Sequence, residues 1–376
     1  MKFICAGSVT LGREAFSTLG ELKEVAETEI DRECVEDADV VVTRSKNRLD
    51  AGLFKGSTVK FAGTCTAGTD HANLSELAAL DIHFASAPGC NANAVSEYVV
   101  AALLEAPDFR FAGKTVGIIG HGEVGTRVDA KLQALGCRVL RYDPPKKAAG
   151  GVGPFVDLDF LLAESDVVTL HIPLVEDGLY PTRNLLGKKE IGKLKSGVCV
   201  INACRGEVVD GEALRTARLS GRISWLVVDV WDPEPEIPQQ LLEAADIATP
   251  HIAGHSVEGK VNGTRQIREQ VLVYFGLDAE AWDPQPLMPS PACEVVDPGE
   301  GGDFESRLRR VVSACYDIQV DNRLLRVEEK PLAERFVAQR RTYRNRREFS
   351  ATEIQGVKED ERAVYLALGF RVSSKG

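Results

Sequence analysis

Three ionisable side chains each follow a short apolar run of the kind that forms a buried strand, and these are Arg205, Glu234 and His251. A guanidinium can clamp a carboxylate or polarise a carbonyl. An imidazole can move the proton of an alcohol, and a carboxylate beside it orients the ring and favours its charged form. The three side chains together predict a site for hydride transfer, in which His251 moves the proton of the alcohol.

A glycine-rich turn lies upstream of these residues. The apolar run Thr115–Ile119 is followed by Gly120, Gly122 and Gly125 in the spacing G-x-G-x-x-G, and then by a helical pattern. The first glycine permits a tight turn, the second lets a pyrophosphate approach the backbone, and the third lets helix and strand pack closely. The N-terminus of the helix offers N–H groups and a positive dipole end to phosphates. The segment therefore predicts a dinucleotide site.

Asp143 indicates which dinucleotide is bound. It ends the next apolar run, 18 residues after Gly125, where a carboxylate can accept hydrogen bonds from both ribose hydroxyls. A carboxylate there would repel a 2′-phosphate, so the sequence favours NAD over NADP. Arg141 and Lys146 lie nearby and act against that preference.

The elements that must position these residues alternate along the chain. Short apolar runs are separated by amphipathic helical stretches up to about residue 275. This alternation predicts an α/β fold with parallel sheets wound in βαβ units. The expected strands are Phe3–Ala6, Val40–Thr43, Val59–Phe61, Thr115–Ile119, Arg138–Tyr142, Val167–His171, Val198–Asn202, Ser224–Val230 and Ile247–Ala248.

The composition of Asp283–Gly302 differs from that of the chain around it. It is rich in proline and glycine and has no apolar periodicity, which is typical of a linker. A helical pattern resumes at Phe304–Tyr316 and is followed by a short α+β stretch. Three structural parts are therefore expected in the 376 residues.

Charge and composition exclude several classes of function. The net charge of −11 disfavours broad attraction to nucleic acid or anionic lipid. The longest uninterrupted apolar run, Tyr98–Leu104, is far too short for a membrane helix. The nine cysteines are scattered without a C-x-x-C pair, which fits a reducing cytoplasm. The spacing of His251 and His255 is compatible with zinc, but no third ligand accompanies them, so no metal site is expected.

These motifs resemble those of the D-isomer-specific 2-hydroxyacid dehydrogenases. A finer resemblance is to the members that oxidise 4-phosphoerythronate in pyridoxal phosphate (vitamin B6) biosynthesis, and it extends over nearly the whole chain. It rests on Gly63–His71, Ala87–Ala92, Asp143-Pro144-Pro145, Glu258-Gly259-Lys260, and a C-terminal extension with Cys315-Tyr316-Asp317 and Arg346-Arg347-Glu348.

The resemblance implies NAD-dependent oxidation of the 2-hydroxyl of 4-phosphoerythronate to the 2-oxo acid. Arg205, Glu234 and His251 are then the active-site residues. The implied cofactor contacts, besides the three glycines, are Glu123, Val124, Asp143, Ile172, Ala203, Cys204, Arg205, Asp229 and Gly254. The implied substrate contacts are Ser45, Thr66 and His255. The sequence departs from the family at Ala6–Thr10, at Ile172, where threonine is expected, and at His255, where tyrosine is expected.

Domain limits are also part of the prediction. A flavodoxin-like substrate-binding domain of residues 1–95 and 253–282 would close on a Rossmann-type NAD-binding domain of residues 96–252, about a hinge near Ser96 and Gly254. After a linker at 283–302, residues 303–376 would form a small α+β domain that joins two copies of the chain, as the resemblance implies.

Two alternatives stay open at this point. One is a dehydrogenase of another phosphorylated 2-hydroxy acid, such as 3-phosphoglycerate. The other is a non-catalytic, NAD-sensing, corepressor-like protein, although such a protein has no need of Arg205, Glu234 and His251 together. The five arginines within 340–347 would form a solvated face, meet acidic groups or a subunit partner, or contact a substrate phosphate.

Overall fold

The computed structural model describes residues 1–151 and 153–373. The chain forms two compact units: residues 1–91 with 256–289, and residues 92–255 with the described chain from Ser290 onward. The expected limits at 95 and 253 lie within a few residues of these boundaries. The first unit passes to the second between Asn91 and Ala92, where the helix Ala92–Leu104 begins. Ser96, the expected hinge residue, therefore lies inside this helix. Residues 303–373 belong to the same unit as the nucleotide-binding domain.

The first unit is built on a parallel sheet of five strands in the order β2-β1-β3-β4-β5. The strands are β1 (Lys2–Ala6), β2 (Glu21–Val25), β3 (Val40–Thr43), β4 (Phe61–Thr64) and β5 (His83–Ala85). The helices of this unit are α1 (Gly12–Phe16), η1 (Glu27–Glu29), α2 (Arg32–Val35), α3 (Ala51–Phe54), α4 (Leu74–Ala79), α12 (Val257–Phe275) and η3 (Gln285–Leu287).

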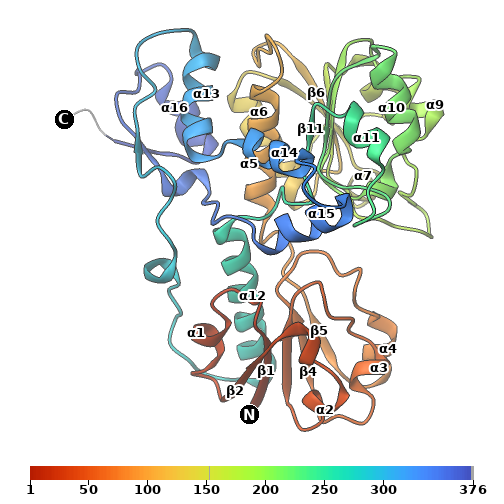
Figure 1. Ribbon diagram of the computed structural model, residues 1–376, viewed down its shortest axis with the longest axis vertical. Coiled ribbons are helices and arrows are strands. Elements are labelled where there is room, and N and C mark those ends of the chain that lie inside the picture. The colour runs from red at the N-terminus through yellow and green to blue at the C-terminus, as the bar shows by residue number, and fades with distance from the viewer. Residues whose placement is uncertain (152, 374–376) are drawn as a thin grey trace. The chain divides into compact units, whose positions relative to one another are not determined.

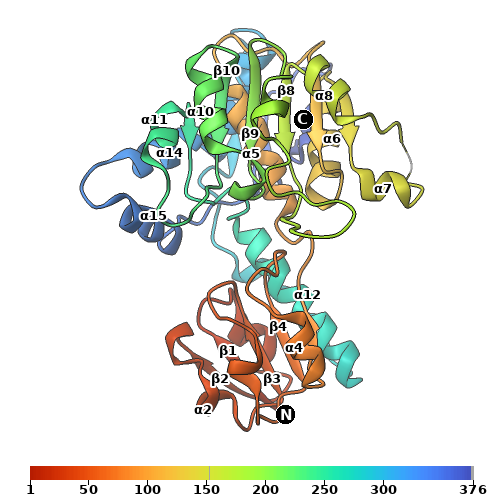
Figure 2. The ribbon, with the colours of Figure 1, turned by 90° about the vertical axis from the view of Figure 1, so that its right-hand side faces the viewer.

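The long helix α12 returns late in the sequence to cover this sheet (Figure 2). Ile267 of α12 lies directly over Gly63, where a Cβ would come within 2.6 Å of the isoleucine methyl. Gly263 of the helix is equally close to the carbonyl of Cys65. The expected strand Val59–Phe61 is displaced along the chain, because β4 spans Phe61–Thr64. The missing side chain of Gly63 in this strand makes room for α12.

The second unit contains a parallel sheet of six strands in the order β11-β10-β9-β8-β6-β7. The strands are β6 (Thr115–Ile119), β7 (Arg138–Tyr142), β8 (Val167–Leu170), β9 (Val198–Asn202), β10 (Ile223–Val228) and β11 (Ile247–Ala248). The strand order reverses between β6 and β8, and ligands bind at such switch points in open α/β sheets.

Helices cover both faces of this sheet (Figure 1). One face carries α5 (Ala92–Leu104) and α6 (Glu123–Ala134), and its core includes Val116, Ile118 and Ile201. The opposite core includes residues of α8, α9, α10 and α11. The further helices of the unit up to His255 are α7 (Pro144–Ala148), α8 (Leu158–Glu164), α9 (Lys188–Ile191), η2 (Gly206–Val208), α10 (Gly211–Leu219) and α11 (Gln239–Ala244).

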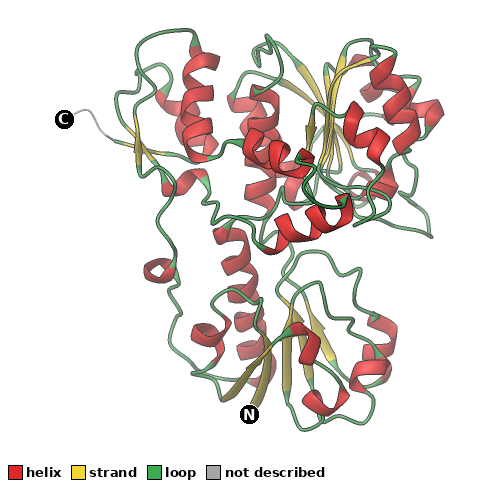
Figure 3. Ribbon diagram, viewed as in Figure 1, coloured by secondary structure: helices red, strands yellow, loops and turns green. Residues whose placement is uncertain are grey.

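The C-terminal extension, residues 290–373, adds a second layer to this unit (Figure 3). Its helix α13 packs on α5, and α16 packs on α6, so the extension shares a hydrophobic core with the nucleotide-binding domain. Its elements are β12 (Val295–Val296), α13 (Phe304–Cys315), α14 (Ile318–Arg326), α15 (Leu332–Arg341), η4 (Phe349–Ala351), β13 (Glu353–Ile354), α16 (Arg362–Leu368) and β14 (Arg371–Val372).

Candidate active site

The glycine turn after β6 is shaped by two close contacts. Gly120 has a φ of +91°, and a Cβ there would lie 2.5 Å from the carbonyl of His171. A Cβ on Gly125 would lie 2.0 Å from the carbonyl of Gly120, so only glycine lets α6 pack this closely on the turn. Around Gly122 a Cβ would meet nothing within 4 Å. The first and third glycines therefore shape the turn, whereas the second leaves open space beside the backbone, as a pyrophosphate requires.

Asp143 lies beside this turn. Its carboxylate accepts hydrogen bonds from the backbone N–H of His121 at 2.8 Å and of Lys146 at 3.0 Å. Arg141 points elsewhere, because its Nε donates to Asp129 at 2.6 Å. Lys146 donates through Nζ to the carbonyl of His121 at 2.6 Å. The acidic group is thus fixed at the end of β7, and Arg141 is already occupied by a carboxylate.

The loop that carries Arg205 is folded by Asn202, the last residue of β9. The Asn202 side chain donates to the carbonyl of Arg205 at 3.1 Å and accepts from the backbone N–H of Cys204 at 3.3 Å. Gly206 packs against Trp231, where a Cβ would lie 2.1 Å from the tryptophan backbone. This glycine therefore keeps the loops after β9 and β10 together.

Glu234 and His251 form the acid–base pair that the sequence predicts. His251 Nδ1 and Glu234 Oε2 are 2.9 Å apart, and both side chains are partly buried. The other oxygen of Glu234 accepts from the backbone N–H of Trp231 at 3.0 Å. Burial opposes ionisation of Glu234, but the hydrogen bond and charge of His251, the Trp231 N–H and Arg340 outweigh it and lower the pKa of this carboxyl. The pair is therefore held with an ionised glutamate.

Asp229 fixes the turn on which His251 stands. His251 has a φ of 55°, in the left-handed region that non-glycine residues rarely adopt. The Asp229 carboxylate accepts from the N–H groups of Ile252 at 2.8 Å and Ala253 at 3.0 Å, and from the hydroxyl of Thr249 at 2.6 Å. Burial raises the pKa of Asp229, while these three donors and His251 act in the opposite direction. Asp229 is thus a bracket for the histidine turn, and its contact with the cofactor stays a prediction.

Trp231 ties the two catalytic loops to each other. Its backbone N–H binds Glu234, and its indole N–H donates to the carbonyl of Thr249 at 3.0 Å. The indole is buried. One residue therefore sets the position of the glutamate relative to the histidine turn.

The remaining expected cofactor contacts lie at the same edge of the sheet. Ile172 lies against the glycine turn, since a Cβ on Gly120 would come within 2.5 Å of its side chain. Ala203 and Cys204 follow β9, and burial raises the pKa of the Cys204 thiol to about 11. Glu123 and Val124 open α6, and Gly254 follows the Asp229-bound turn. Their contacts with a cofactor stay predictions.

The expected substrate residues are divided between the units. His255 belongs to the second unit, where its ring meets Tyr343 edge-on with centroids 5.8 Å apart. Ser45 and Thr66 belong to the first unit and follow β3 and β4. The Thr66 hydroxyl is 2.9 Å from that of Thr64 and from the carbonyl of Gly68.

The first unit gathers positive charge near Ser45. Burial, and then the nearby charge of Arg44, lower the pKa of Lys260 to about 8. Lys46 and Arg48 line a hollow with Asp70 and His71. A surface of this kind suits an anionic ligand.

Two classes of site were searched for in the described residues. Nowhere in residues 1–151 and 153–373 do three His, Cys, Asp or Glu side chains gather as a metal site would require. In the same part of the chain, every helix is too short or too polar to cross a bilayer.

Comparisons with known proteins agree with this geometry. The family model for the D-isomer specific 2-hydroxyacid dehydrogenase, NAD binding domain, matches residues 93–253. A domain of unknown function (DUF3410) matches residues 287–369. An erythronate-4-phosphate dehydrogenase of Pectobacterium carotovorum is 40% identical over 379 residues, covering 100% of both chains. One of Klebsiella pneumoniae is 39% identical over 98% of both. The chain belongs to the erythronate-4-phosphate dehydrogenase family.

Membership of this family confirms the resemblance seen in the motifs and makes the protein an NAD-dependent dehydrogenase. The predicted Rossmann-type fold is also confirmed by solved structures. A 3-phosphoglycerate dehydrogenase of Entamoeba histolytica has a TM-score of 0.62 and 26% identity, covering 73% of this chain and 95% of that chain. A D-lactate dehydrogenase of Aquifex aeolicus has a TM-score of 0.60 and 24% identity, covering 73% and 96%.

Sequence reasoning missed three contributors to the site of this family member: Trp231, the bracketing role of Asp229, and Arg340 of the extension. In a sequence, an aspartate at a strand end indicates a ligand contact as readily as a carboxylate that binds the backbone N–H groups of a neighbouring loop. For Trp231, a tryptophan directly after a strand is the signal in the sequence that could have indicated how the following loop packs.

Proposed function

We propose that this protein oxidises the 2-hydroxyl of 4-phosphoerythronate to the corresponding 2-oxo acid, with NAD as hydride acceptor. The observation that carries the reaction type is the Glu234–His251 pair, 2.9 Å apart beside the loop of Arg205. The substrate follows from the name that the full-length relatives share. The product would serve the formation of pyridoxal phosphate.

The residues at the sheet edge fit NAD. The glycine turn leaves space beside Gly122, and Asp143 is fixed next to that turn. In the proposal, its carboxylate accepts from the ribose hydroxyls. NAD, when bound, accepts the hydride that leaves carbon 2 of the substrate. The Asp143 carboxylate disfavours a 2′-phosphate by charge repulsion.

The chain's own residues move the proton. Because His251 Nδ1 is hydrogen-bonded to Glu234, the neutral ring carries its proton on Nδ1. Nε2 is then unprotonated, and in this proposal it faces the 2-hydroxyl. Nε2 takes the hydroxyl proton as the hydride leaves carbon 2, and the ionised Glu234 stabilises the imidazolium that forms. Arg205 binds the substrate carboxylate and polarises the developing carbonyl. In the reverse direction, His251 returns the proton.

Ser45, Thr66 and His255 would hold the rest of the substrate, together with the positive charge around Arg44 and Lys260. A phosphorylated acid carries at least two negative charges at neutral pH. Cations held close together in the free protein gain most from such a ligand, because the anion relieves their mutual repulsion.

An assay panel tests the assignment. NADH formation is measured with 4-phosphoerythronate, 3-phosphoglycerate, erythronate and D-lactate at equal concentration. The proposal expects the highest kcat/KM for 4-phosphoerythronate and at least about 100-fold less for erythronate, because erythronate lacks the phosphate that the positive charge around Arg44 and Lys260 would bind. A preference for 3-phosphoglycerate would show that the assigned substrate is wrong but would leave the proposed mechanism unchanged. Absence of turnover with all four acids, with NAD still bound, would favour a sensor.

The extension also supports a proposal on assembly. Leu324 of α14 and Val337 of α15 are 53% and 50% exposed, and Val327 and Leu366 are exposed as well. We propose that these apolar side chains are covered in a homodimer formed through residues 303–373. Light scattering of Leu324→Asp and Val337→Asp tests this: the wild type is expected as a dimer and the variants as monomers. A monomeric wild type would contradict the proposal.

The cysteines support a proposal on location. The nine cysteines all lie in the described residues, and none of them forms a disulfide there. We propose that the protein works in the reducing cytoplasm. Fractionation of the native host, with the enzyme assayed in each fraction, tests this.

A further inference from the structure

We propose that Arg340 is a positioning residue for the Glu234–His251 pair, so that the C-terminal extension completes the active site of its own chain. The inference rests on the acid–base roles proposed above for Glu234 and His251. It goes beyond them by assigning a catalytic task to a segment whose matching family model is a domain of unknown function.

The contact of Arg340 with Glu234 is direct. Arg340 Nη1 lies 3.4 Å from Glu234 Oε2, the same oxygen that His251 contacts at 2.9 Å. The Arg340 guanidinium also lies over the ring of Phe336, one turn earlier in α15, at 5.5 Å from its centroid. Phe336 is buried in the core of the nucleotide-binding domain. The arginine is therefore held at the glutamate by its own helix.

A second arginine of the extension holds the turn that carries His251. Arg346 is buried, and its Nη1 donates to the carbonyl of Ala253 at 3.1 Å. Its Nη2 donates to the carbonyl of Ala94 in α5 at 2.8 Å. The N–H of Ala253 donates to Asp229, so the backbone of this residue is held on both sides of its Cα. The extension thus touches the histidine turn and its glutamate at separate points.

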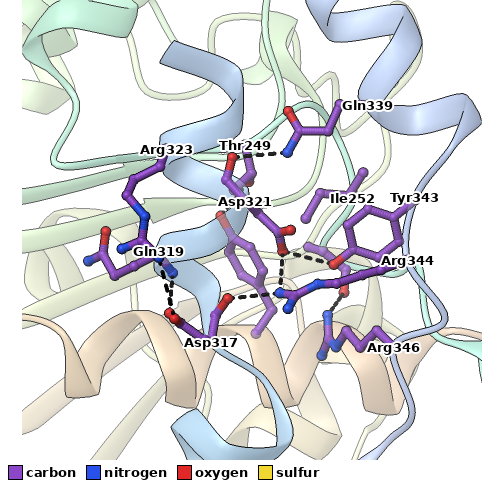
Figure 4. A network of polar contacts seen from close by, with 12 residues as sticks. Thr249, Ile252, Asp317, Gln319, Asp321, Arg323, Gln339, Tyr343, Arg344 and Arg346 are labelled. Carbon is purple, nitrogen blue, oxygen red and sulfur yellow. Dashed lines mark hydrogen bonds and ion pairs between the residues drawn. The ribbon is translucent and has the colours of Figure 1, made fainter. Parts of the chain in front are cut away.

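The chain around these two arginines is held by Asp321 of α14, in the same extension (Figure 4). The buried carboxylate of Asp321 accepts from the hydroxyl of Tyr343 at 2.9 Å and from Arg344 at 3.1 Å. Gln339 donates to the carbonyl of Asp321 at 2.9 Å. Three of the five arginines of 340–347 therefore meet carboxylates of the same chain, namely Arg340 with Glu234, Arg344 with Asp321 and Arg346 with Glu97.

The charge of Arg340 has a consequence for the proton transfer. Glu234 faces two positive groups, Arg340 and protonated His251, and one neutral donor, the Trp231 N–H. The carboxylate of Asp229 also interacts electrostatically with His251. Arg340 is one of the charges that lower the pKa of Glu234, so it helps to keep this carboxylate ionised beside His251. It also prevents the carboxylate from rotating away from Nδ1.

The test compares Arg340→Gln with Arg341→Gln, which changes an exposed arginine at the end of the same helix. Arg340→Gln is expected to lower kcat by about 10-fold to 100-fold, with NAD affinity unchanged, because the acid–base pair is misplaced and the cofactor is not. The acidic limb of the pH profile for oxidation is expected to move up, because the variant lacks one of the charges that lower the pKa of Glu234. Arg341→Gln is expected to behave as the wild type, and thermal melting verifies that each variant is folded.

Two further variants separate positioning from a merely structural role. In a Glu234→Gln background, Arg340→Gln is expected to cause no additional loss of kcat, because the arginine acts through the glutamate. Arg340→Lys keeps the charge, so its acidic limb is expected at the wild-type pH while its kcat is intermediate. Additive losses in the double variant, or a displaced limb in Arg340→Lys, would overturn the proposal, and the lysine variant decides if the glutamine variant does not fold.

His251→Asn in the same series distinguishes this inference from the proposed function. If His251→Asn is inactive and Arg340→Gln keeps the wild-type kcat and pH profile, only the inference on the extension fails. If His251→Asn keeps its kcat, the acid–base assignment fails, and the inference fails with it.

Discussion

The two ends of the candidate active site are built in different ways. The nucleotide end is local: a turn of six residues and one aspartate at the end of the next strand supply its geometry. The acid–base end is assembled from β10, β11 and a helix of the extension about 100 residues further along the chain. A common cofactor is thus held by a compact motif, whereas the reacting groups are positioned by contacts between distant segments.

The difference teaches where each function can be changed. Within the short motif, cofactor binding can be altered at the open position, Gly122, without disturbing the remainder of the unit. The acid–base pair depends on Asp229, Trp231, Arg340 and Arg346, none of which needs to touch the substrate. Substitutions at Trp231, Arg340 or Arg346, which are not among the predicted cofactor contacts, should therefore alter turnover without altering cofactor binding.

The largest effect is expected at the acid–base end. His251→Asn should lower kcat by about 100-fold to 10,000-fold, because a positioned proton-transfer group contributes that much. NAD binding, followed by fluorescence titration, should stay within a factor of about two, since the nucleotide end is separate. An enzyme with near-normal kcat would show that another group moves the proton.

Two glycines sharpen the comparison within the nucleotide end. Gly125→Ala should destabilise the fold by about 1–3 kcal/mol, because its Cβ would lie 2.0 Å from a carbonyl and α6 must shift. Gly122→Ala, where a Cβ meets nothing within 4 Å, should leave the unfolding free energy nearly unchanged and weaken NAD binding. Urea denaturation and NAD titration measure the two quantities. Equal stability losses in both variants would contradict the division of roles.

The sequence was most informative where the structure is local. Apolar runs predicted β3, β6, β7 and β9 at the residues where they lie, and the strand ends pointed to Arg205, Glu234 and His251. The edge strand β2 was missed because most of its side chains are exposed and give no apolar pattern.

The rest of the site could not be read from the sequence. Asp229 occurs at a strand end, where a ligand contact and a bracket for backbone amides have the same local pattern. Arg340 lies in a basic run whose composition fits solvent, phosphate or a partner equally well. Only the packing of α15 on the nucleotide-binding domain shows that this arginine meets Glu234.

A smaller effect is expected at Asp143. Asp143→Asn removes the charge that repels a 2′-phosphate, so the ratio of kcat/KM for NAD to that for NADP should fall by about 10-fold. Arg141 is held by Asp129 and should not replace the lost discrimination. Asp157→Asn, at an exposed carboxylate of the same unit, serves as the control and should leave the ratio unchanged. A wild type that already prefers NADP would show that Lys146 governs the ribose end.

The smallest effect concerns the place where the extension meets α5. Burial first, and then the nearby Glu348, raise the pKa of Glu97 to about 8, although Arg346 and Lys131 act in the opposite direction. The folded protein therefore binds a proton at Glu97 that the unfolded chain has released above about pH 4.5. Where the folded state holds more protons than the unfolded state, the unfolding free energy falls as the pH rises. The contribution of Glu97 to stability therefore decreases as the pH rises toward 8.

Glu97→Gln should remove this dependence, because the amide cannot ionise. Between pH 6.5 and 8, the unfolding free energy of the wild type should fall by about 1–2 kcal/mol relative to that of the variant, as urea denaturation at both pH values measures. His171, whose pKa burial lowers to about 3, is present in both proteins, so its own pH dependence cancels in the comparison. A parallel pH dependence in both proteins would show that the ionised Glu97 is fully compensated by Arg346 and Lys131. The extension would then be held at α5 by a complete ion pair at all pH values in this interval.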